Sequence, residues 1–95
     1  MRVRLSLDAR NDLLTIRDHI ADTTDPVIAA RVVARFDAIL TTLASFPSIG
    51  HDGTAKGTRE MLTPRIPYVV VYRIEMTDAE DELVVLRVYH TSRGR

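Results

Sequence analysis

Apolar residues recur at a helical spacing through the first half of the chain. An alternating segment over residues 2–7 predicts a strand, and the period then changes at Asp8. The residues that repeat every three or four positions are Ala9, Leu13, Ile16 and Ile20. Asp8 stands where a carboxylate would accept from the free amides of a first turn, so we expect it to be the N-cap of a helix that ends near residues 22–24.

A second and stronger helical repeat follows. Asp25 and Pro26 predict its start, because aspartate caps helix N-termini and proline suits the first helical position. Pro47 predicts its end. The apolar positions between them are Ala29, Val32, Val33, Phe36, Ile39, Leu40, Leu43 and Phe46. Two amphipathic helices joined by about three residues predict an antiparallel hairpin, whose apolar stripe must pack against a sheet.

The last third of the chain is rich in Val, Tyr and Leu and predicts strands. The expected strands are residues 58–63, 68–76 and 83–90, with a glycine-containing loop over 47–57 and a turn over 77–82. The predicted fold class is α+β: an N-terminal strand, an antiparallel helical hairpin and a three-stranded antiparallel meander in one sheet. A chain of 95 residues makes one domain, residues 1–95.

Both faces of the last predicted hairpin are apolar. Strict alternation would turn Val70, Tyr72, Ile74, Val84, Leu86 and Val88 toward the helices. It would leave on the other face Val69, Val71, Arg73, Glu75, Leu83, Val85, Arg87 and Tyr89. In an even register Arg73 and Arg87 would be cross-strand neighbours, a repulsive arrangement unless an anion or Glu75 lies between them. We therefore expect this second face to be a binding surface.

Composition narrows the classes of function. The chain has 13 basic and 13 acidic residues, and this zero net charge disfavours a protein whose affinity rests on many phosphate contacts. The absence of cysteine excludes disulfides and thiolate chemistry. No apolar run approaches the roughly 20 residues of a membrane span, and no secretory signal precedes the first strand, so we expect a cytoplasmic protein without membrane contact.

Few side chains suit catalysis or metal binding. His19 and His51 lack partners at ligand spacing, so we expect neither a metal nor a cofactor. His90 lies at a strand end and is either a half-buried histidine bonded to a main-chain carbonyl or a group that acts directly on a target. Arg59 either forms a salt bridge with Glu60 or contacts a partner. Arg73 and Arg87 are the strongest candidates for binding, because Glu75 alone offers little acid on their face.

Five local sequences carry a family resemblance through their order and spacing. They are DLLTIRDHI (12–20), LASFPSIG (43–50), TREML (58–62), PYVVVYRI (67–74) and LRVYHTSR (86–93). Together they resemble the ParE/RelE toxin superfamily of bacterial type II toxin–antitoxin modules over almost the whole chain. The resemblance implies the fold described above. It also implies a growth-arresting toxin, associated with plasmid stabilisation, that a cognate antitoxin neutralises.

Two activities follow from this resemblance. The RelE side implies a metal-independent, ribosome-dependent mRNA endonuclease, and the ParE side implies a DNA gyrase inhibitor that is not an enzyme. His90 matches a near-C-terminal histidine that does acid–base work in some RelE-like members. Val69, however, stands where histidine-dependent nucleases of the superfamily have an arginine, and Thr91 where an aromatic residue is usual. These departures favour the ParE side.

The resemblance and the residue pattern together define the expected contacts. Target or antitoxin binding is expected at Arg59, Arg73, Arg87, Tyr89, His90 and Arg93, with His90 catalytic only in the nuclease alternative. The implied partners are an antitoxin with a ribbon–helix–helix, ParD-like domain, in a toxin–antitoxin hetero-oligomer, and DNA gyrase as target. In the alternative, the target is the ribosome with its mRNA.

Overall fold

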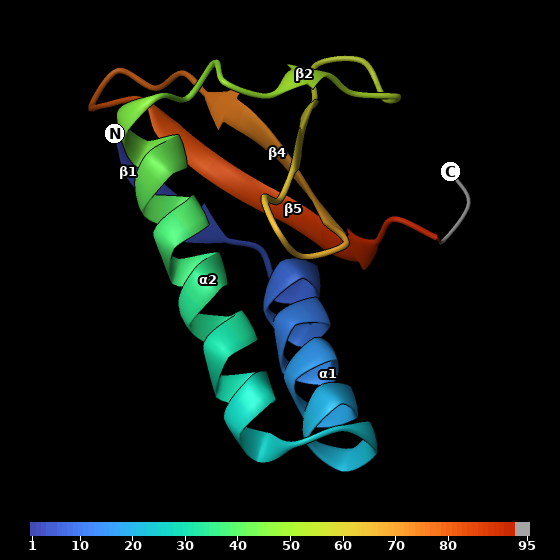
Figure 1. Cartoon of the computed structure of the whole chain (residues 1–95). Helices are drawn as coiled ribbons and strands as arrows, with labels where there is room; N and C mark the ends of the chain where they lie inside the picture. Colours follow the sequence, from blue (N-terminus) through green and yellow to red (C-terminus); the bar gives the residue numbers. More distant parts are fainter. Residues whose placement is uncertain (93–95) are drawn as a thin grey trace.

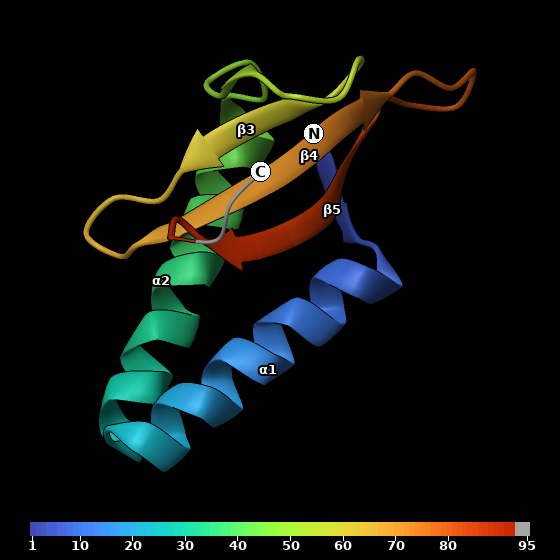
Figure 2. The same cartoon turned by 90° about the vertical axis from the view of Figure 1, so that its right-hand side faces the viewer.

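In the computed structural model, which describes residues 1–92, two helices cover one face of a five-stranded sheet (Figures 1 and 2). In chain order the elements are β1 (Arg2–Leu5), α1 (Leu7–Thr23), α2 (Pro26–Ser45), β2 (His51–Asp52), β3 (Arg59–Leu62), β4 (Tyr68–Glu75) and β5 (Glu82–His90). The strands lie side by side in the order β1-β5-β4-β3-β2. The α+β class, the helical hairpin and the antiparallel meander of β3, β4 and β5 are confirmed.

Two strand pairings go beyond the predicted meander. The N-terminal strand β1 runs parallel to β5 at one edge of the sheet, and the short β2 forms inside the predicted loop and pairs with β3 at the other edge. The β1–β5 pair joins segments about 80 residues apart, for example Val3 with Leu83. The alternation of apolar and polar residues within a strand does not reveal which distant strand it will pair with. The reason is that the main-chain groups at a free strand edge can bond to any other strand.

Helix starts follow side-chain capping. The Asp25 carboxylate accepts from the Val27 amide at 2.6 Å and Pro26 opens α2, as predicted. The prediction for α1 is wrong: the cap is Ser6, whose hydroxyl accepts from the Ala9 amide at 3.0 Å. Asp8 instead lies in the first helical turn, where a carboxylate favourably meets the positive end of the helix dipole.

A bulge in β5 changes which residues face the helices. Val71 lies opposite Arg87 but the next residue, Tyr72, lies opposite Val85, so Leu86 is the extra residue. The shift turns Leu83 and Val85 into the core beneath the helices and places Val84 on the other side, against the strict alternation predicted. The buried core consists of Ala9, Phe36, Ile39, Leu43, Tyr68, Val70, Tyr72, Leu83, Val85 and Val88.

The face of the sheet away from the helices exposes fewer apolar side chains than the alternating pattern predicted. Val69 and Val84 lie on it and are only 0% and 1% exposed. Arg4 and Arg73 are the cross-strand partners of Val84, and long arginine side chains at such positions can cover an apolar neighbour with their aliphatic stems. One exposed large apolar residue, Leu62, lies on this face as the cross-strand partner of Val69. Others lie on the helices or in the loop after α2: Leu7, Leu14, Val27, Ile28, Phe46 and Ile49.

Candidate functional site

Arg73 belongs to a charge network on the open face of the sheet. Its guanidinium donates to Glu75 Oε1 from Nη2 at 2.6 Å and from Nε at 3.2 Å. Arg4 donates to Glu82 at 2.8 Å and approaches Glu75 at 3.5 Å. The hydrogen bond from Arg73 lowers the pKa of Glu75, and the charges of Arg73 and Arg4 act in the same direction. The expected shortage of acid on this face is therefore wrong, because Glu82 supplies a second carboxylate.

Arg87 is not the direct cross-strand partner of Arg73. In the observed register Arg73 pairs with Val84, and Arg87 pairs with Val71. The Arg87 guanidinium reaches Asp12 on α1, with Nε at 2.8 Å and Nη2 at 3.0 Å from the two carboxylate oxygens. This bond raises the pKa of Arg87. Asp12 of α1 thus neutralises Arg87. The residue pattern of the strands alone could not reveal this helix carboxylate.

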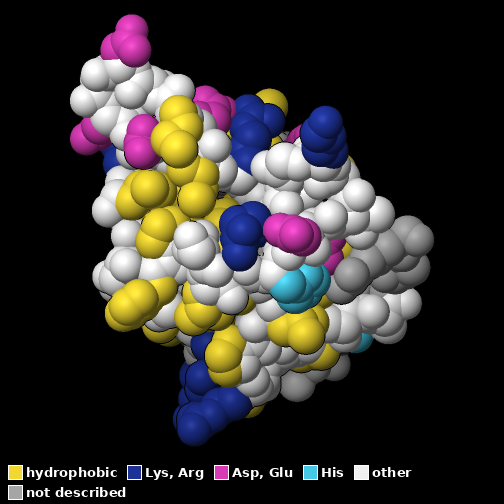
Figure 3. Space-filling view, turned by 90° about the horizontal axis from the view of Figure 1, so that it is seen from above, with side chains coloured by type: hydrophobic (Ala, Val, Ile, Leu, Met, Phe, Trp, Pro, Cys, Tyr) yellow, Lys and Arg dark blue, Asp and Glu magenta, His cyan; other side chains and the backbone are white. Residues whose placement is uncertain are grey.

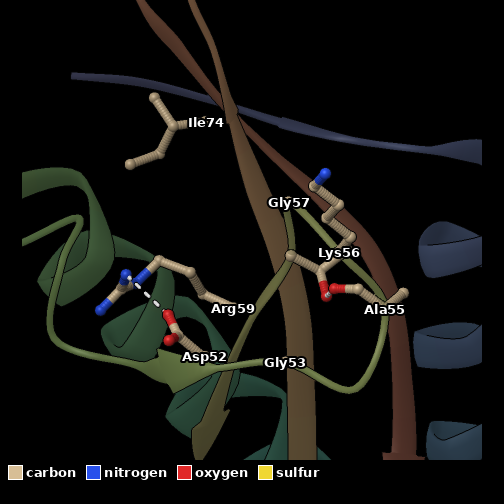
Figure 4. A pocket seen from close by; sticks show the side chains of 8 residues that line it. Asp52, Gly53, Ala55, Lys56, Gly57, Arg59 and Ile74 are labelled. Carbon is tan, nitrogen blue, oxygen red and sulfur yellow. Dashed lines mark hydrogen bonds and ion pairs between the residues drawn. The ribbon is translucent and has the colours of Figure 1, made fainter.

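Arg59 fastens a loop. Its Nη2 donates to Ser48 O at 2.9 Å and to Gly50 O, and its Nη1 lies 3.7 Å from the Asp52 carboxylate on the neighbouring β2 (Figure 4). The predicted alternative, a salt bridge to Glu60, is not what forms, since Glu60 turns to the other face and accepts from the Thr54 amide. Beside Arg59, a pocket of about 470 Å³ is lined by Asp52, Gly53, Ala55, Lys56, Gly57, Thr58 and Ile74.

His90 lines a separate pocket of about 330 Å³ between α1 and the end of β5, together with Asp12, Thr15, His19 and Tyr68. The ring is half-buried and meets Tyr68 edge-on, with centroids 5.3 Å apart. Its Nδ1 accepts from the Ser92 amide at 3.0 Å rather than bonding to a carbonyl. Since an amide only donates, the neutral ring carries its proton on Nε2. Burial raises the pKa of Tyr68.

The predicted site residues do not converge. Arg59 pairs with Tyr72 and His90 with Tyr68, so these two lie four residues apart along β4, or about 13 Å. Arg73 lies on the opposite face of the sheet from both. Tyr89 is half-buried on that open face, opposite Val69. Arg93 lies outside the described residues.

Tyr72 and Gly50, whose roles the sequence pattern did not reveal, form a clamp with Arg59 on residues 47–50. The buried Tyr72 hydroxyl donates to Pro47 O at 2.7 Å and accepts from the Gly50 amide at 3.0 Å. A Cβ at Gly50 would lie 2.7 Å from that hydroxyl, so only glycine fits. The clamp leaves Phe46 and Ile49 exposed. The sequence signal that could have indicated this exposed turn is the pair Phe46 and Ile49 on either side of Pro47, just after the end of α2.

Neither a metal centre nor a membrane helix is found in the part of the chain that the structure describes. Across residues 1–92, no group of three or more His, Asp or Glu side chains is arranged to hold a metal ion. Neither α1 nor α2 is long and apolar enough to cross a membrane, again judged on these residues.

Comparisons with known proteins agree with this architecture. A protein of Sinorhizobium fredii named "Putative toxin Y4kP" is 38% identical over 89 residues, which cover 94% of this chain and 86% of that protein. The toxin–antitoxin complex RelBE2 from Mycobacterium tuberculosis contains a chain that is 29% identical, with a TM-score of 0.60 and coverage of 94% and 95%.

A structure of the chromosomal ParDE system from P. aeruginosa has the same fold. It superposes with a TM-score of 0.84 over 97% of both chains at 21% identity. Residues 3–94 match the family described as "ParE toxin of type II toxin-antitoxin system, parDE". The chain therefore belongs to the ParE toxin family of type II toxin–antitoxin systems.

Proposed function

We propose that this toxin arrests growth by inhibiting DNA gyrase. The observation that carries the proposal is the dispersal of the groups that a nuclease would need. RNA cleavage requires a base, an acid and cations around one phosphate. Arg59, Arg73 and Arg87 are each bonded within the chain, and they lie at different places on the sheet.

The charge of the molecule supports the same proposal. A ribosome-directed nuclease gains association rate from a basic surface. Here the arginines of the open face alternate with Glu75, Glu80 and Glu82, and the net charge is zero. Such a surface has little long-range attraction for RNA and is better suited to a protein target.

A cognate antitoxin is the second partner in this proposal. The similar ParDE and RelBE2 proteins are named as toxin–antitoxin systems or complexes. By this likeness the chain would form a hetero-oligomer with a ParD-like, ribbon–helix–helix antitoxin. Both partners and the target would meet in the cytoplasm.

The RelE-like nuclease remains a second candidate because of one observation. The pocket at the end of β5 is lined by His90, His19 and Tyr68, whose side chains can exchange protons. Among residues 1–92, no arginine or lysine lines that pocket.

A supercoiling assay tests the proposal. Toxin released from its antitoxin complex should block supercoiling by purified gyrase and cause cleaved DNA to accumulate, and added antitoxin should restore activity. Expression in cells should induce the DNA-damage response. Codon-specific cuts in ribosome-bound mRNA, with supercoiling unaffected, would establish the nuclease instead.

A further inference from the structure

Tyr68 is a buried tyrosine whose hydroxyl forms no hydrogen bond within residues 1–92. The residue is 8% exposed, and its ring packs edge-on against Phe36 at a centroid distance of 5.6 Å. Tyrosine hydroxyls that are buried usually bond to a partner, because an unpaired polar group loses its hydration without compensation. A phenylalanine here would make the same ring contacts, so packing alone gives the hydroxyl no role.

The Tyr68 side chain lines the pocket of about 330 Å³ between α1 and the end of β5. Its oxygen is not among the side-chain atoms of residues 1–92 that are sealed from solvent without a partner, so the hydroxyl opens onto this pocket. Burial raises the pKa of Tyr68. The hydroxyl therefore keeps its proton near neutral pH and can donate a hydrogen bond to a ligand.

His90 supplies a second donor to the same pocket. The Ser92 amide and the Ser92 hydroxyl contact its Nδ1 at 3.0 Å and 2.7 Å. The proton of the neutral ring therefore lies on Nε2, which has no hydrogen bond to any of residues 1–92. The rings of His90 and Tyr68 are 5.3 Å apart, so the two unpaired donors belong to adjacent side chains.

One face of α1 forms another wall of the pocket. Its lining residues are three or four positions apart and so project from one side of the helix: Asp12, Thr15, Ile16 and His19. Asp12 would repel an anion if it were free. Its carboxylate is instead neutralised by Arg87, at 2.8 Å and 3.0 Å, and also accepts from the Val88 amide at 2.9 Å.

The surface seen from above mixes both charges. Figure 3 shows Lys and Arg side chains beside Asp and Glu side chains and among hydrophobic ones. Arg59 and Arg73 are already bonded within the chain. The pocket at the end of β5 is different, because the two donors described above have no acceptor among residues 1–92.

We propose that this pocket binds a monocarboxylate on a small apolar body, with the Tyr68 hydroxyl and His90 Nε2 as donors to the carboxylate oxygens. Hydrogen bonds to an ionised acceptor are stronger than those to a neutral one. Ile16 and Val88 provide apolar walls for the body of the ligand, and the pocket volume lies near the lower end of the range of about 300–1,000 Å³ for ligand sites. This site goes beyond the proposed function and holds for either cellular target.

Benzoate is the probe, added to the full chain after release from its antitoxin. The three histidines give separate imidazole signals in NMR spectra. Benzoate should shift the signals of His90 and His19 with a Kd on the order of 1 mM, and should leave that of His51, which lies outside the pocket on β2, unchanged. Benzamide, a neutral molecule of the same shape, should bind about tenfold or more weakly.

Tyr68→Phe separates binding from folding. Because the hydroxyl has no partner within residues 1–92, the variant should melt within about 3 °C of wild type. It should nevertheless bind benzoate about tenfold or more weakly, since a hydrogen bond to a charged group is lost. His51→Asn is the control and should bind benzoate as wild type does.

The antitoxin distinguishes two sources of the carboxylate. If added antitoxin displaces benzoate, the natural ligand is a glutamate or aspartate side chain of a bound protein. If benzoate stays bound in the complex, the natural ligand is a free small molecule. Unshifted His90 and His19 signals at about 20 mM benzoate, the result for a pocket that holds only water, would overturn the site. Equal affinity for benzamide, or unchanged benzoate affinity in Tyr68→Phe, would overturn it as well.

Discussion

The Asp12 carboxylate on α1 binds the Arg87 guanidinium and the Val88 amide of β5 at the same time. The amide bond is 2.9 Å long and joins residues 76 positions apart. β1 pairs only with the first half of β5, up to Val85, and Ser6 binds Val85 O and Leu86 O, so the edge beyond Leu86 would otherwise be open. One helical side chain thus fastens α1 to the sheet and satisfies an edge amide.

Removal of this carboxylate should loosen the helix–sheet contact. We expect Asp12→Ala to lower the free energy of unfolding by about 1–3 kcal/mol, because the Val88 amide and the Arg87 guanidinium both lose their hydrogen-bond partner. Urea unfolding followed by circular dichroism measures the change. Asp18→Ala is the matched control, since Asp18 forms only an exposed pair with Arg17 and should cost about 0.5 kcal/mol or less. Equal losses in the two variants would contradict the role given to Asp12.

Stability should depend on pH through Glu75. Its pKa is lowered in the folded protein by the hydrogen bond from Arg73, so the stabilisation is present above the unfolded value of about 4.3 and is lost as pH falls through the folded pKa. Glu75→Gln should therefore lose less stability than wild type between pH 5 and pH 3, which is read from urea midpoints. Glu80→Gln is the control. The Glu80 carboxylate lies 3.7 Å from Arg2, so the stability of this variant should depend on pH as that of wild type does.

The Tyr72 hydroxyl should contribute measurably to stability. In Tyr72→Phe the buried Pro47 carbonyl and Gly50 amide lose their partner, at a cost of about 1–3 kcal/mol. For a chain of this size each 1 kcal/mol corresponds to a melting temperature about 4–8 °C lower. Tyr89→Phe serves as control, because within residues 1–92 the Tyr89 hydroxyl has no hydrogen bond to lose. A melting temperature unchanged by Tyr72→Phe would show that the turn is not held by this hydroxyl.

His90 separates the two proposed activities. Asparagine at this position can place an oxygen near Nδ1 and still accept from the Ser92 amide, but it cannot transfer a proton. Under the gyrase proposal we expect His90→Asn to retain most growth arrest and His90→Ala to lose part of it through weaker folding. A nuclease would lose about 10²-fold or more in rate with either change. Complete detoxification by a normally melting His90→Asn protein would contradict the gyrase proposal.

Local patterns were sufficient for the elements and their class. Helical periodicity and the Asp25–Pro26 start located α2, and runs of Val and Tyr located β4 and β5, because these signals depend on neighbours within one or two turns. The order and spacing of short segments were sufficient for the ParE/RelE resemblance, which the family match confirms. The elements and the family could both be predicted because each depends on short stretches of neighbouring residues and on their order along the chain.

Tertiary structure decided what the candidate residues do. The bulge at Leu86 exchanged the faces of Val84 and Val85, so that Val85 and not Val84 packs beneath the helices. The β5 strand also meets Asp12 from a helix 75 residues away, and this carboxylate neutralises Arg87. The clamp of Tyr72 and Arg59 on residues 47–50 likewise joins distant segments. A sequence specifies alternation and capping through neighbouring residues, but charge pairing and register depend on which strand and helix edges come together when the core closes.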